Sequence, residues 1–167
     1  MFYEVLGNEP VGAHERAGVT AILSENEKSE NVIVTSVITH MEVLPEKLDS
    51  KGADDERDYM ALFDAVKFAE IELNRNILMR AREIRDYYYQ EADENGSGGK
   101  MMDLGDAIHL ATASIYGVTE FHTRDDNNKG SKVGLLGLYQ RRNETKLCEK
   151  YPLKILSPKS DQGEFFT

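Results

Sequence analysis

An α/β fold with a parallel sheet is the class that this sequence predicts, because short β-branched runs alternate with segments of helical period. The clearest strand is VIVTSV at residues 32–37, which polar residues bound on both sides. Residues 118–123 (VTEFHT) and 153–157 (LKILS) are the next predicted strands. In such sheets, helix N-termini and strand C-termini share one edge, where ligands bind. The fold class therefore indicates where a functional site should lie.

Predicted helices separate these strands. Five segments are predicted to be helical: residues 13–25, from about Thr39, 54–65, 74–92 and 106–116. Apolar residues recur at helical spacing in residues 13–25 and 74–92. Gly117 ends the last of them in the usual C-terminal position. The segment VKFAEIEL (66–73) alternates like a strand but could also extend either neighbouring helix. Residues 93–100 (DENGSGGK) are expected to form a mobile loop, and residues 133–140 a short helix.

Length and composition predict one domain over residues 1–158 and a loose tail at 159–167, because 167 residues can bury one sizeable core. No apolar stretch approaches the roughly 20 residues that cross a bilayer, and no basic segment precedes an apolar one at the N-terminus. We therefore expect a cytoplasmic protein that does not contact a membrane. The single cysteine, Cys148, cannot form an intramolecular disulfide and is expected to be inert.

The formal net charge of −10 argues against broad electrostatic capture of nucleic acid, which usually needs a basic face. It does not exclude a nuclease, because cations bound to clustered carboxylates reverse the local field. The sequence has no GxSxG elbow and no Walker or Rossmann glycine loop, so a serine hydrolase and a phosphate-loop enzyme are unsupported.

Three acidic residues map to the predicted ligand-binding edge. Glu42 follows the first strand, Asp106 begins a helix, and Asp125 lies two residues beyond the strand at 118–123. Close carboxylates repel one another unless protons or cations compensate. Hard divalent ions such as Mg²⁺ and Mn²⁺ prefer oxygen ligands. Convergence of these acids therefore predicts a metal site.

Each acid alone also has a purely structural interpretation. Asp106 could be an N-cap that accepts backbone N–H bonds. Thr39 and Glu42 match a capping box, and Asp125 could form an Asx-turn. Asp103 is interpreted as loop or first-turn charge rather than as a ligand. Only the joint placement of the acids on one edge favours the metal site.

Three stretches of the chain resemble a known family. They are TSVITHMEVL (35–44), GDAIHLATASIYGVTEFHTRDD (105–126) and LKILSP (153–158), and they are similar to the PIN domain, the fold of VapC-type toxin ribonucleases and related nucleases. The resemblance implies a three-layer α/β/α sandwich around a central parallel sheet. It also implies cleavage of RNA phosphodiester bonds that depends on Mg²⁺ or Mn²⁺.

Carried over by position, the resemblance makes Glu42, Asp106 and Asp125 the catalytic, metal-binding acids. Thr123 would be the hydroxyl that supports the site, and we assign it to substrate binding. A metal held by these carboxylates would lower the pKa of a bound water and stabilise charge on the phosphorane.

The sequence departs from the family at its start. PIN domains begin with a strand that ends in an aspartate, whereas MFYEVLGNEP (1–10) resembles the residues that follow that aspartate. Three explanations stay open: an upstream coding start, a degenerate member of the family, or completion by another chain. We favour the upstream start, and we expect the missing residues to restore metal-dependent cleavage.

The resemblance also suggests partners. The leading function is an endoribonuclease, possibly a toxin that an antitoxin protein holds inactive, and the chain could form a homodimer. The alternative function is a catalytically impaired PIN-like module that binds RNA or a protein partner. A third interpretation is that the acids are only caps in an unrelated α/β fold.

Overall fold

The computed structural model describes the chain in six stretches: residues 13–43, 53–63, 68–95, 99–126, 132–139 and 153–158. Contacts divide the chain into two units, which are residues 1–71 with 158–167 and residues 72–157, and each is described by itself. Both units contain helices and a pair of parallel strands, which confirms the predicted α/β class. The departure at residues 1–10, Cys148 and the tail at 159–167 lie outside the described residues.

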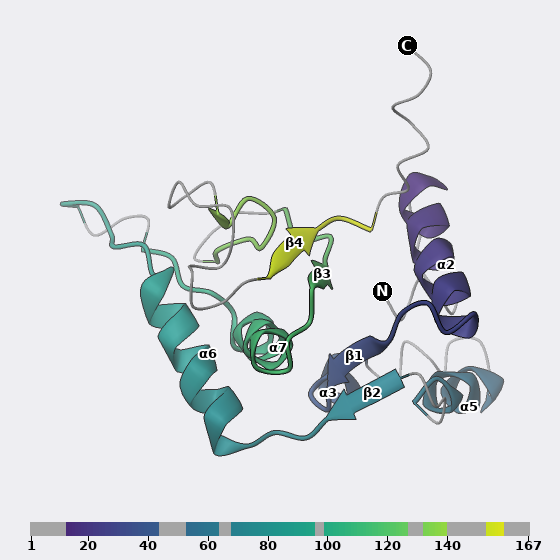
Figure 1. The fold of residues 1–167 in the computed structure, drawn as a ribbon. Coiled ribbons are helices and arrows are strands. Elements are labelled where there is room, and N and C mark those ends of the chain that lie inside the picture. Colours follow the sequence, from purple (N-terminus) through teal and green to yellow (C-terminus); the bar gives the residue numbers. More distant parts are fainter. Residues whose placement is uncertain are drawn as a thin grey trace, which may run out of the picture. The chain divides into compact units, whose positions relative to one another are not determined.

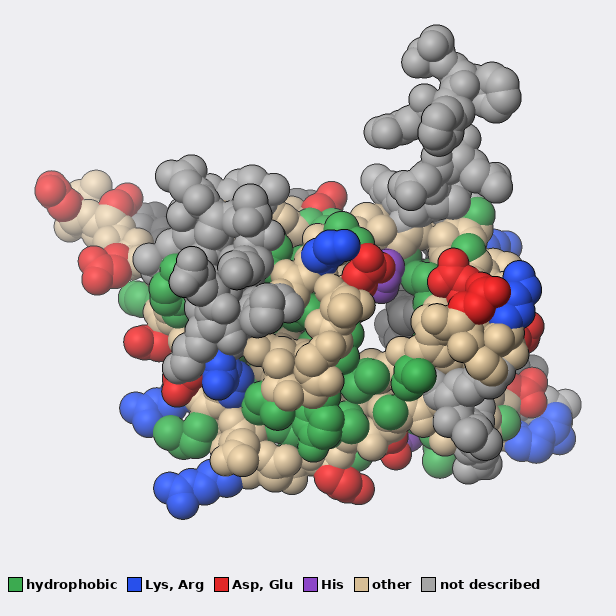
Figure 2. Space-filling model, in the orientation of Figure 1, with side chains coloured by type: hydrophobic (Ala, Val, Ile, Leu, Met, Phe, Trp, Pro, Cys, Tyr) green, Lys and Arg blue, Asp and Glu red, His purple; other side chains and the backbone are tan. Residues whose placement is uncertain are grey.

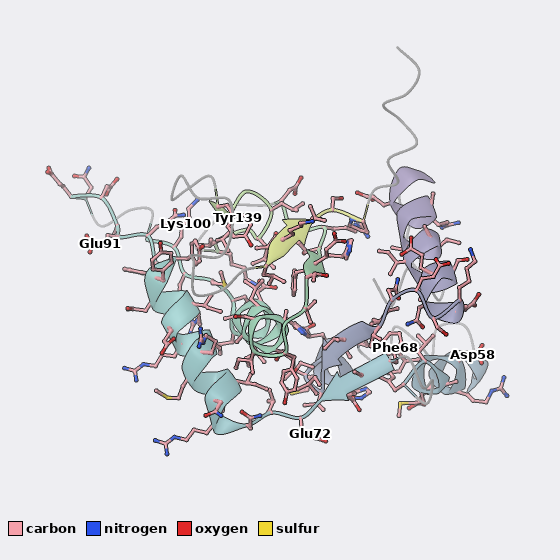
Figure 3. All side chains as sticks on the ribbon, in the orientation of Figure 1. Asp58, Phe68, Glu72, Glu91, Lys100 and Tyr139 are labelled. Atoms are coloured by element: carbon pink, nitrogen blue, oxygen red, sulfur yellow. The ribbon has the colours of Figure 1, made fainter. Side chains whose placement is uncertain are left out.

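In the first unit, strand β1 (Ile33–Ser36) pairs in parallel with β2 (Phe68–Ile71). The register places Ile33 opposite Phe68 and Ser36 opposite Ile71. Figure 1 shows the two strands side by side. Figure 3 labels Phe68 where β2 begins. The ambiguous segment at 66–73 is thus a strand in its centre, because β1 supplies the backbone partners that local sequence cannot reveal.

Three helices of the first unit are described: α2 (Ala13–Glu27), α3 (Thr39–Glu42) and α5 (Ala53–Ala61). The end of α2 is fixed by the amide of Asn31, which donates to the Ile22 carbonyl at 3.1 Å and to the Glu25 carboxylate at 3.1 Å. This contact returns the chain from the helix end to β1. The short helix α3 follows β1 directly, as the sequence predicts.

The second unit is built on two packed helices, α6 (Arg75–Tyr87) and α7 (Leu104–Ile115), which lie side by side in Figure 1. Asn74 caps α6, since its side chain accepts the Ile77 N–H at 3.1 Å. One stripe of α6 and one of α7 are buried: Ile77, Ala81, Ile84, Tyr88, Ala107, Leu110 and Ala111. The small residues of α7 allow close approach of the two backbones, and this packing forms the core of the unit.

Gly117 ends α7 as predicted. Its φ of 68° is left-handed, and the Val118 N–H bonds to the Ala113 carbonyl at 2.9 Å, which is the bond of a Schellman motif. The chain then enters β3 (Glu120–His122), which pairs in parallel with β4 (Lys154–Leu156). Only a short turn therefore connects helix α7 to strand β3.

The prediction of a helix at 133–140 is wrong for residues 133–138, which form an irregular stretch followed by one turn, and Tyr139 is in 3₁₀ conformation. Val133, Leu135 and Leu138 are buried there. Two N–H groups of this segment bond to Asp125 rather than within a helix, as described below. No helix in the described parts of the chain is both long and apolar enough to span a membrane. The single domain over 1–158 stays a prediction.

Candidate functional site

The N-terminus of α7 shows which aspartate caps this helix. The Asp103 carboxylate accepts the Gly105 N–H at 3.0 Å, and Asp103 is the N-cap residue. Asp106 is the third residue of the helix, three positions after Asp103, and is half-buried. The interpretation of Asp106 as an N-cap is therefore wrong. Asp106 is the acidic residue of the first turn of α7 and lies at the positive end of the helix.

Thr123 and Asp125 form a compact unit just beyond β3. The Asp125 N–H donates to the Thr123 hydroxyl at 3.1 Å, and Thr123 itself extends the pairing with β4 through its N–H and the Leu156 carbonyl. Thr123 thus connects the strand to the backbone of Asp125. This contact gives the hydroxyl a positioning role, whereas the substrate contact assigned to it stays a prediction.

Asp125 also holds a distant segment. Its carboxylate oxygen Oδ2 accepts the Leu135 N–H at 3.2 Å, and its backbone carbonyl accepts the Leu136 N–H at 2.8 Å. The predicted Asx-turn would use the N–H of residue 127, which lies outside the described residues. The contact with Leu135 reaches ten residues along the chain, and it orients the Asp125 carboxylate at long range.

Lys132 is a residue of this edge that the sequence did not indicate. Its ammonium lies 2.9 Å from Asp103 Oδ2, and its backbone forms a parallel bridge with Met101. The hydrogen bond to Asp103, with the charges of Asp103, Asp106 and Asp125, raises the pKa of Lys132. In return, the Lys132 hydrogen bond and the Gly105 N–H lower the pKa of the Asp103 carboxyl. Three carboxylates of the second unit thus act on one ammonium.

Glu42 lies in the first unit, on α3, and is exposed. The capping box predicted around it is wrong. The N-cap position is Ile38, without a side-chain bond, and Thr39 lies within the helix. The buried Thr39 hydroxyl pairs instead with that of Thr35 at 2.7 Å. This bond holds α3 to β1.

His40 contributes a second connection from α3. Its Nδ1 lies 2.8 Å from the Tyr59 hydroxyl on α5, and its Nε2 pairs with the Glu70 carboxylate on β2. The imidazole also packs against the rings of Tyr59 and Phe63, with centroids 5.6 and 4.7 Å away. Helix α3, which carries Glu42, is therefore held to both neighbouring elements of its unit.

A comparison with known protein families identifies the family of this chain. The sequence model of the PIN domain matches residues 12–130, which is more than half of the 167 residues. This chain belongs to the PIN domain family. No curated protein and no solved structure matches it. The PIN domain is generally a metal-dependent nuclease fold.

The acids of this PIN domain can be tested for their fit to a metal ion. Within the described residues, no group of three or more His, Cys, Asp or Glu side chains is arranged to hold one. Asp106 and Asp125 nevertheless supply hard oxygen donors, and both act electrostatically on the Lys132 ammonium. Their chemistry therefore fits a hard cation such as Mg²⁺ or Mn²⁺.

The structure brings together only part of the predicted site. Asp106 and Asp125 belong to the second unit, where both influence Lys132. Glu42 belongs to the first unit, which is described by itself. Convergence of all three acids on one metal therefore stays a prediction. Two of the three candidate ligands, Asp106 and Asp125, therefore belong to the same unit, and both raise the pKa of Lys132.

Proposed function

We propose that this PIN domain is an endoribonuclease that depends on a divalent metal, Mg²⁺ or Mn²⁺. Glu42, Asp106 and Asp125 are the proposed catalytic and metal-binding residues. The observation that carries the proposal is the match of residues 12–130 to the PIN domain, with Asp106 in the first turn of α7 and Asp125 just beyond β3. A bound ion would supply an activated water and would stabilise charge on the cleaved phosphate.

The protein residues of the second unit prepare the site for this chemistry. The first turn of α7 presents Asp106 beside the partial positive charge of the helix N-terminus, which favours the ionised carboxylate. Thr123 and Leu135 hold the backbone and one oxygen of Asp125. On the face that Figure 2 shows, the Lys and Arg side chains of the described residues are dispersed. Because the formal net charge of the chain is −10, a bound cation would supply positive charge where the RNA phosphate approaches.

The test is cleavage of a labelled single-stranded RNA with Mg²⁺ or Mn²⁺ and with a chelator. Asp106→Asn, Asp125→Asn and Glu42→Gln should each lower the cleavage rate by about a hundredfold or more, because each removes a ligand charge. Asp126→Asn is the matched control, since it removes the same charge beside Asp125 from an exposed side chain. Cleavage that continues in the presence of the chelator, or that all the acid variants retain, would refute the proposed metal-dependent nuclease.

The alternative function is a catalytically impaired module that binds RNA or a protein partner without cleavage. The ion pair of Lys132 with Asp103 favours it, because part of the acidic charge is already neutralised within the chain. This second function would be supported if the chain binds RNA but does not cleave it at every concentration of Mg²⁺ or Mn²⁺ tested.

A toxin role belongs to the same proposal. As a VapC-type toxin, the chain would act in the cytoplasm on RNA, and an antitoxin protein would inhibit it. It could also form a homodimer. Expression in a bacterial host tests the toxin role. Growth arrest by the wild type, and none by Asp106→Asn, is the expected result.

A further inference from the structure

The charge of Lys132 has a consequence for any metal bound at the Asp106 and Asp125 edge. We propose that Lys132 is an internal counter-cation of this site, whose ammonium a divalent ion displaces on binding. Lys132 would thereby set the affinity for the metal. The inference rests on the proposed function, because it assumes that the metal binds near Asp106 and Asp125.

The backbone around Lys132 places its side chain at the site by contacts that do not need the ammonium. Residue 132 forms the bridge with Met101, close before the start of α7. Three residues further on, the Leu135 N–H bonds to the Asp125 carboxylate. The segment 132–136 therefore contacts residues just before α7 at one end and Asp125, just beyond β3, at the other.

The ammonium itself is held by a contact that can be released. It pairs with Asp103 at 2.9 Å, and the Lys132 side chain is 67% exposed, so water can replace the pair without unfolding. Asp103 keeps its bond to the Gly105 N–H when the lysine leaves, so the cap of α7 persists. The geometry thus permits the lysine to move while the acids stay in place.

The electrostatics give the direction of the effect. Lys132 is charged at neutral pH, and the attraction by the acids raises its pKa further. When a divalent ion binds to Asp106 and Asp125, either the ammonium stays and is repelled by the ion, or it moves into solvent and loses its attraction to the acids. Each of these changes lowers the free energy gained on metal binding. Removal of the positive charge should therefore raise the affinity for the metal.

The experiment measures Mn²⁺ binding to the full chain by the loss of the free-ion EPR signal. Lys132→Met should bind Mn²⁺ at least about threefold more tightly than the wild type at low salt, as a nearby unit charge predicts. The gain should shrink at about 0.5 M salt, because salt screens exposed charges. Lys132→Arg keeps the charge and should bind like the wild type.

Lys154→Met is the matched control. Lys154 is also an exposed lysine of the second unit, and it pairs with Glu120 at 3.7 Å. It stands at the opposite end of the strand pair, where β4 begins, whereas Asp125 follows the end of β3. Lys154→Met should leave Mn²⁺ affinity unchanged, which separates a local effect from a change in net charge.

The outcomes separate this inference from the proposed function. If Asp106→Asn abolishes Mn²⁺ binding while Lys132→Met equals the wild type, the metal site stands and the counter-cation is refuted. Weaker Mn²⁺ binding by Lys132→Met refutes it as well, and would make Lys132 a support of the site. If neither the wild type nor Lys132→Met binds Mn²⁺, both proposals fail. Binding by Lys132→Met alone would support the inference in its strongest form.

Discussion

The hydroxyl of Tyr59 lies 2.8 Å from Nδ1 of His40, so a buried tyrosine of α5 is bonded to the helix that carries Glu42. Tyr59→Phe keeps the ring contacts with His40 and Phe63 but removes this bond. We expect a loss of about 0.5–1.5 kcal/mol in the free energy of unfolding. Urea denaturation measures it. Tyr116→Phe, on an exposed tyrosine, is the control, and equal stability of the two variants would contradict the expectation.

Two substitutions at Asp103 separate its cap from its ion pair. Asp103→Asn keeps a side-chain oxygen for the Gly105 N–H and loses only the pair with Lys132. Its stability should stay close to that of the wild type, because exposed ion pairs contribute little. Asp103→Ala loses the cap as well and should cost about 1 kcal/mol. Urea denaturation of both variants is the test, and an equal loss would assign the stabilisation to the ion pair.

The same carboxyl predicts a dependence of stability on pH. Because folding lowers the pKa of Asp103 below its ordinary value of 3.8, its contribution is present above that pH. The contribution is lost as the pH falls through the lower pKa of the folded state. The stability difference between wild type and Asp103→Ala should therefore shrink as urea denaturation is repeated below pH 3.8. A difference that grows on acidification would contradict this sign.

Thr123 offers a test of positioning at the proposed metal site. Its hydroxyl accepts the Asp125 N–H at 3.1 Å, so Thr123→Ala leaves the Asp125 backbone without this bond. Loss of such a supporting group typically weakens metal affinity by about tenfold or more. Thr123→Ser keeps the hydroxyl and should restore Mn²⁺ binding. An alanine variant that binds Mn²⁺ like the wild type would leave Thr123 with a structural role only.

The strands were predictable because their signals are local. β-branched residues dominate β1, and the predicted strands at 118–123 and 153–157 contain β3 and β4. The left-handed Gly117 was also predictable, since a glycine after an apolar helical run has few other uses. The prediction that failed depends on a contact between residues that are distant in sequence. The sequence predicts a helix at 133–140, but Asp125 accepts hydrogen bonds from two N–H groups of this segment.

The acidic residues of the candidate site could be predicted from the sequence, but the neighbouring Lys132 could not. Asp106 and Asp125 follow from the position of a helix start and a strand end. The choice of cap between Asp103 and Asp106 depends on a shift of one turn, which boundary signals do not resolve. Lys132 joins Asp103 across 29 residues of sequence through a backbone bridge beside Met101, and no short motif reports such a pairing.

Backbone groups anchor the segment 132–136, through the bridge at Met101 and the N–H groups of Leu135 and Leu136. These anchors are independent of the side chain at position 132. Evolution or an engineer can therefore exchange that side chain for a neutral, acidic or bulkier one without rebuilding the loop. Position 132 is thus a place to adjust the ion preference of the proposed metal site, whereas a change at Asp125 would remove the contact of its carboxylate with the Leu135 N–H.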